Sequence, residues 1–142
     1  MRPYIKKTAR QGAVVVELAL LSPLLCTLTL GMMEMGRGSM VCTILSTAAR
    51  NGAQVAALPT SSNATVISRI NNVLTANNIT AANATITILV NGAVADVSSA
   101  NANAEITVTV SIPASQTCLT NFSVPLLQNT TFSATLTMIR LG

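Results

Sequence analysis

The chain has 142 residues, enough for one small domain, and half of them are apolar although it holds only one Tyr, two Phe and no Trp. The net charge is +4, but half of the basic residues precede Gly12: Arg2, Lys6, Lys7 and Arg10. The rest of the chain is therefore formally neutral. This distribution excludes a nucleic-acid-binding surface, which needs clustered basic residues with stacking aromatics.

The first two segments are a polar leader and an apolar stretch. Residues 1–12 carry the basic cluster, and 13–33 (AVVVELALLSPLLCTLTLGMM) carry one charge, Glu17. About 20 apolar residues cross a bilayer as a helix, so 13–33 is predicted to be a transmembrane segment in contact with lipid. The basic residues before it predict a cytoplasmic N-terminus and place the rest of the chain outside the cytoplasm.

The same helix is predicted to continue beyond the membrane over 34–58. Small and apolar residues recur there at helical spacing (Ile44, Ala48, Ala49 and Val55). Pro59 then ends the helix, because a proline disfavours helical backbone in the residue before it.

The last segment, 59–142, is predicted to be a small extracytoplasmic α+β domain. Residues 60–78 form a short amphipathic helix with one apolar face (Val66, Ile70, Val73 and Leu74). Three segments alternate apolar with small polar residues, as half-buried antiparallel strands do: 84–92, 104–113 and 131–139. The predicted fold class is therefore α+β: a long N-terminal helix, a short second helix and a three-stranded antiparallel sheet. Either the short helix or the outer part of the long one covers the apolar face of the sheet.

No motif in the sequence indicates an enzyme. The chain lacks histidine, and its acids Asp96 and Glu105 read as solvated charges. Its three cysteines show no metal-ligand spacing. No catalytic, cofactor-binding or metal-binding residue is therefore predicted.

Two features of the extracytoplasmic part are candidates for contacts. Cys42 and Cys118 are the candidate disulfide, since oxidising compartments outside the cytoplasm favour such bonds. Arg50 lies in an otherwise uncharged helical stretch, and it contacts either a partner or the chain's own globular part.

The N-terminus is compared with three ordinary kinds of segment. A cleaved secretory signal fits the basic leader, but the apolar stretch is too long and no small-residue cleavage site follows it. A lipoprotein signal fits poorly, because Pro-Leu-Leu precedes Cys26. A plain signal anchor fits well but leaves Glu17 unexplained, and a charge within a membrane span is costly and usually functional.

A further pattern accounts for these parts together. A basic leader, Gly12 and an apolar helix with Glu17 five residues on resemble the type IV prepilin processing motif. The segments Gly31-Met-Met-Glu-Met-Gly-Arg37 and Ala49-Arg-Asn-Gly-Ala53 extend the resemblance to the TadE-like minor pilins (pseudopilins) of tight-adherence (Tad) systems. The closing TFSATLTMIR is also similar to that family. The chain departs from it at Leu18 and Asn51, where an aromatic residue and a glutamate are common.

This resemblance implies a function and a set of partners. A prepilin peptidase would cut between Gly12 and Ala13 and create a new α-amino group there. Glu17, one helical turn away, would pair with its own terminus or a neighbour's and set subunit register during assembly. Pro23 removes one backbone hydrogen bond and is the candidate position for a functional kink or local loosening of the helix. The alternative is a kink without a function that the membrane span tolerates. The implied partners are other pilin and minor pilin subunits and the Tad assembly platform of the inner membrane, where the chain would reside before any transfer to the pilus.

The alternative function is a single-pass, signal-anchored extracytoplasmic binding domain that is never processed. The identity of the mature N-terminus separates the two functions.

Overall fold

The computed structural model describes residues 7–117 and 129–141, with side chains from residue 12 onward. The chain divides into two compact units, Met1–Met35 and Gly36–Gly142. Helix α1 (Lys7–Ala56) belongs to the first unit up to Met35 and to the second from Gly36. Its end at Ala56, two residues before the predicted one, agrees with the proline at position 59.

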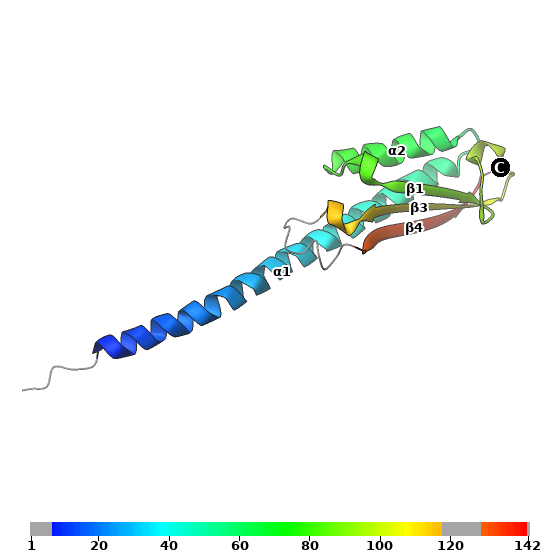
Figure 1. The fold of residues 1–142 in the computed structure, drawn as a ribbon. Coiled ribbons are helices and arrows are strands. Elements are labelled where there is room, and N and C mark those ends of the chain that lie inside the picture. The colour runs from blue at the N-terminus through cyan, green and yellow to red at the C-terminus, as the bar shows by residue number, and fades with distance from the viewer. Residues whose placement is uncertain (1–6, 118–128, 142) are drawn as a thin grey trace, which may run out of the picture. The chain divides into compact units, whose positions relative to one another are not determined.

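The second unit contains the sheet and the second helix (Figure 1). Among its described residues, three short 3-10 turns connect the elements: η1 (Ala81–Asn83), η2 (Val97–Ser99) and η3 (Ala114–Gln116). The regular elements are α2 (Asn63–Ala76), β1 (Thr85–Val90), β2 (Ala93–Val94), β3 (Glu105–Pro113) and β4 (Thr131–Ile139). The predicted α+β fold class is therefore confirmed.

Within the described part of the chain the sheet has four strands, not the predicted three, in the order β2-β1-β3-β4 with all neighbours antiparallel. The additional strand follows a tight turn at Asn91 and Gly92, whose φ angles are 50° and 80°. Two positive φ angles match the twist of a two-residue hairpin, and Asn-Gly favours them. The segment predicted as one strand, 84–92, therefore ends at this turn and pairs with β2.

The core lies between one face of the sheet and both helices. The alternation predicted over 104–113 is confirmed in β3, where four apolar side chains share one face and are fully buried (Ile106, Val108, Val110 and Ile112). Both helices contribute side chains to the same core cluster, so the short helix α2 and the outer part of α1 together cover the apolar face of the sheet. In α1, Ile44, Ala48 and Ala49 are buried while Val55 is half-buried. In α2, Val66, Ile70 and Leu74 are buried while Val73 is half-buried.

The opposite face of the sheet is lined with hydroxyl groups. The hydroxyl oxygens of Thr107 and Thr137 lie 2.9 Å apart across β3 and β4, and those of Thr109 and Thr135 are at the same distance. Cross-strand threonine pairs of this kind contribute roughly 0.2–1 kcal/mol each. The period-2 alternation thus separates an apolar inner face from a hydroxyl-lined outer face.

Asp96 begins the turn η2 as its N-cap. The backbone N–H of Ser98 donates to Asp96 Oδ1 over 2.8 Å and lowers the pKa of this carboxyl below its ordinary value. The cap is therefore formed at neutral pH and is lost as the pH falls through the lowered pKa. This exposed carboxylate has a structural role in the turn.

Gly52 allows α1 to approach α2 closely. A Cβ at this position would lie 2.7 Å from Cδ1 and Cγ1 of Ile70 and 3.5 Å from a methyl of Val108. Ile70 is fully buried and cannot move toward solvent. We expect Gly52→Ala to lower the free energy of unfolding by about 1–2 kcal/mol, because overpacking outweighs the gain in helix propensity.

Gly36→Ala is the matched control for this prediction. A Cβ at Gly36 meets no atom within 4 Å, so the same substitution in the same helix should be neutral or stabilising by up to about 1 kcal/mol. Both values come from thermal unfolding of the full chain in detergent, followed by circular dichroism. Equal effects at the two glycines would show that close packing at Gly52 is not the cause.

Candidate processing and assembly segment

The apolar part of α1 is the one helix in the described residues that is long and apolar enough to cross a membrane. Large side chains cover its surface without protein contacts: Val14, Val15 and Val16 are 60–65% exposed, and Leu20 is 74% exposed. An apolar surface of this extent needs an apolar environment. It fits a single-pass membrane anchor.

Gly12, Ala13 and Glu17 all lie within α1, which continues through all three. Residues four apart lie on one face of a helix, with Cβ atoms about 5–6 Å apart, so the Glu17 side chain projects beside position 13. A Cβ on Gly12 would meet nothing within 4 Å. The structure thus brings the predicted cleavage position and the predicted acid within one helical turn of each other.

Pro23 lies inside α1, which continues on both sides of it. A proline lacks the N–H that would otherwise donate to the carbonyl four residues earlier, here that of Ala19. The hydroxyl of Ser22 lies 3.5 Å from this oxygen and can donate to it. In lipid an unpaired carbonyl is costly, so Ser22 compensates in part for the proline.

The other hydroxyls of the span are also satisfied within the helix. Thr27 Oγ1 donates to the carbonyl of Pro23 and Thr29 Oγ1 to that of Leu25, each over 2.8 Å. Side chains that bond one turn back present little polarity to lipid. Among the polar side chains described here for the span, the carboxylate of Glu17 is therefore the one whose presence a plain membrane anchor does not explain.

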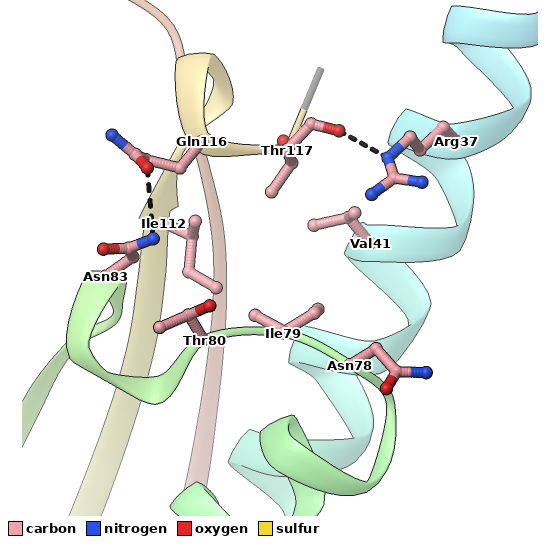
Figure 2. A pocket seen from close by; sticks show the side chains of 9 residues that line it. All are labelled: Arg37, Val41, Asn78, Ile79, Thr80, Asn83, Ile112, Gln116 and Thr117. Atoms are coloured by element: carbon pink, nitrogen blue, oxygen red, sulfur yellow. Dashed lines mark hydrogen bonds between the residues drawn. The ribbon is translucent and has the colours of Figure 1, made fainter. Parts of the chain in front are cut away.

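Arg37, from the Gly31–Arg37 segment, lines a small cavity in the second unit (Figure 2). Its Nε donates to the backbone oxygen of Thr117 over 2.5 Å, while Asn83 Nδ2 donates to Gln116 Oε1 over 3.1 Å. The cavity measures about 60 Å³, far below the roughly 300–1,000 Å³ of a typical ligand pocket. Arg37 therefore ties α1 to the end of the turn η3, and we assign no substrate to this cavity.

The second pattern segment, Ala49–Ala53, also has a packing role. Arg50 is exposed, whereas the neighbouring Asn51 accepts a hydrogen bond from Arg69 of α2 over 3.5 Å. Asn51 and Gly52, rather than Arg50, thus face the second helix.

The candidate disulfide falls partly outside the described residues. Cys42 is an exposed free thiol on α1, and Cys118 lies outside the described residues. No group of three or more His, Cys, Asp or Glu side chains within the described part of the chain could hold a metal ion.

Arg140, for which the sequence predicted no role, is only 6% exposed. Its Nη1 donates to the carbonyl of Val97, and its Nη2 donates to that of Pro59 over 2.5 Å. The backbone N–H of Leu141 also donates to the carbonyl of Ala57 over 2.9 Å. The end of β4 is thereby fixed to η2 and to the end of α1.

Comparison with known proteins identifies one family. The model of the family described as TadE-like protein matches residues 12–54, a little under a third of the chain. This match confirms the resemblance drawn from the sequence, and it covers the predicted cleavage position, Glu17 and both pattern segments. No curated protein and no solved structure matches the chain. The family match and the apolar helix together fit a membrane protein associated with a Tad pilus.

Proposed function

We propose, with the TadE-like match and the apolar helix as the premise, that this chain is a minor pilin or pseudopilin. A prepilin peptidase cuts it between Gly12 and Ala13 on the cytoplasmic side of the inner membrane. The mature subunit then takes part in assembly of a Tad pilus or related secretion machine, in contact with other pilins and the assembly platform. Its role is structural, as the family's is, and not enzymatic.

The observation that carries this proposal is the position of Glu17 relative to Gly12 and Ala13. Cutting after Gly12 would remove the four basic residues of the leader and leave one new cation, the α-amino group of Ala13. That amine would lie within one turn of Glu17 on the same helix. An ionised pair costs less in hydrocarbon than an isolated carboxylate, and exchange of partners between subunits would fix their axial register.

The alternative, an unprocessed anchored binding domain, receives less support. It accounts for the basic leader and the apolar helix, but it gives the acid in the span no partner. The cavity that Arg37 lines, about 60 Å³, is also far smaller than a typical ligand pocket.

Glu17→Ala tests the assembly role. We expect leader removal to continue, because the scissile bond is unchanged, while the amount of subunit in the sheared pilus fraction falls about tenfold or more. The measurement is quantitative immunoblotting of the membrane and sheared fractions, with the mass of the membrane-bound subunit confirming leader removal.

Thr29→Ala is the control, since Thr29 bonds within its own helix and should be dispensable for assembly. Normal incorporation of Glu17→Ala would rule out the register role. Loss of incorporation by both variants would indicate general damage to the span.

A further inference from the structure

The chain contains two Asn-Gly pairs, Asn51-Gly52 in α1 and Asn91-Gly92 in the turn between β1 and β2. In such a pair the backbone nitrogen of the glycine can attack Cγ of the asparagine, because glycine has no Cβ to obstruct the approach. The attack closes a succinimide ring and releases the side-chain nitrogen as ammonia. A water molecule then opens the ring at either carbonyl, which leaves aspartate or isoaspartate. In isoaspartate the main chain runs through an extra methylene.

The pair in α1 is held in a conformation that opposes this attack. The N–H of Gly52 lies inside a regular helix and donates to the carbonyl four residues earlier. The carboxamide of Asn51 is held at both ends, since Nδ2 donates to the carbonyl of Thr47 over 2.9 Å and Oδ1 accepts from Arg69 over 3.5 Å. Gly52 also lies against the fully buried Ile70. Ring closure at Asn51 therefore requires opening of the helix and of the core beside it.

The pair in the turn is held by fewer contacts. Asn91 and Gly92 are both exposed, and a Cβ on Gly92 would meet no atom within 4 Å. Within the described ranges, neither the N–H of Gly92 nor the side-chain nitrogen of Asn91 donates a hydrogen bond. The carboxamide is held at one end, where Oδ1 accepts from the backbone N–H of Glu105 over 2.9 Å. Ring closure at Asn91 has to break this bond and rotate the backbone of the turn.

Opening of this turn disturbs little of the fold. β2 pairs with β1 through two residue pairs, and both of its residues, Ala93 and Val94, are exposed. A short exposed segment of this kind opens locally at a small fraction of the free energy of global unfolding. The conformations in which the nitrogen of Gly92 reaches Cγ of Asn91 are therefore accessible from the folded state.

We propose that Asn91 is a self-modification site, at which the folded chain takes up water, loses ammonia and forms aspartate and isoaspartate, while Asn51 is protected. Aspartate keeps an oxygen that can accept from the N–H of Glu105, so it preserves the turn. Isoaspartate lengthens the main chain inside a two-residue hairpin loop, whose twist no longer matches the strands, and it releases β2 from β1. This modification lies outside the proposed assembly role and does not depend on leader removal.

Peptide mapping of the full wild-type chain by mass spectrometry tests this site. The chain is incubated in detergent in mildly alkaline buffer, and digestion in heavy-oxygen water marks any ammonia loss that occurs after the incubation. In the folded chain we expect Asn91 to be converted at least about tenfold faster than Asn51, because only Asn51 requires opening of the packed core. In denaturant the two residues should react at similar rates, since each then precedes a glycine in an unfolded chain.

Two results would overturn the proposal: an Asn91 that keeps its amide in the folded chain while the denatured chain loses it, or equal rates at Asn51 and Asn91 before denaturation. Asn91→Asp separates the two products. Hydrogen exchange of the β2 amides should rise in the incubated wild type with its isoaspartate content and stay at the starting level in Asn91→Asp. Unchanged exchange in the incubated wild type, or equally fast exchange in Asn91→Asp, would contradict the release of β2 by main-chain lengthening.

Discussion

Gly12→Leu should leave the leader attached, and the uncut precursor should accumulate in the membrane. A peptidase must reach the backbone between residues 12 and 13, and a glycine there presents no side chain. Glycine also weakens the helix by about 1 kcal/mol relative to alanine, which favours local opening at a bond that lies inside α1. Leucine would remove both advantages, so we expect the cleavage rate to fall about a hundredfold or more.

Two matched variants separate these causes. Gly12→Ala restores helix propensity with little bulk and should be cut at a reduced rate. Gly31→Leu adds the same bulk in the same helix at a position where a Cβ also meets nothing within 4 Å, and it should be cut normally. The readout is the intact mass of the protein purified from cells that contain the peptidase. Efficient cutting of Gly12→Leu would remove the recognition role of this glycine.

Arg140→Met should destabilise the second unit by about 2–5 kcal/mol. Methionine keeps much of the aliphatic volume but removes both donors, so the carbonyls of Val97 and Pro59 lose their partners. Each buried acceptor left unpaired costs roughly 1–3 kcal/mol. The cation is also lost beside the end of α1, where the helix dipole favours positive charge.

Arg140→Lys and Arg69→Met complete this test. A lysine presents one point charge and cannot hold two carbonyls in the fork geometry of a guanidinium, so its effect should be intermediate. Arg69 is exposed on α2, and its replacement should change the free energy of unfolding by no more than about 0.5 kcal/mol. Denaturant unfolding of the full chain in detergent measures all three. Equal stability of Arg140→Met and wild type would contradict the anchoring role.

The fold was predictable wherever periodicity is strong. The apolar face of β3 and that of α2 follow from spacing alone, and both are buried as predicted except for Val73, which is half-buried. The fourth strand was missed because β2 is two residues long and too short to show a period, although Asn91-Gly92 is the signal that marks its turn.

The contacts of isolated arginines were not predictable in the same way. Arg140 bonds to residues 43 and 81 positions away, and no local pattern encodes such distances. Arg37 was recognisable as part of a family segment, but its partner Thr117 is 80 residues away. The roles of Gly12 and Glu17 came from the resemblance, which the family match supports over 12–54. Spacing alone would have indicated only an acid in a membrane span.

The mature N-terminus of the wild-type chain tests the central claim most directly. The protein is purified from membranes of matched cells with and without an active prepilin peptidase, and its terminal peptide is identified by mass spectrometry. We expect Ala13 as the first residue where the peptidase is active and an intact leader where it is absent. A leader retained in both membranes would contradict the processing that the proposed function requires, and it would favour an anchored domain that is never cut.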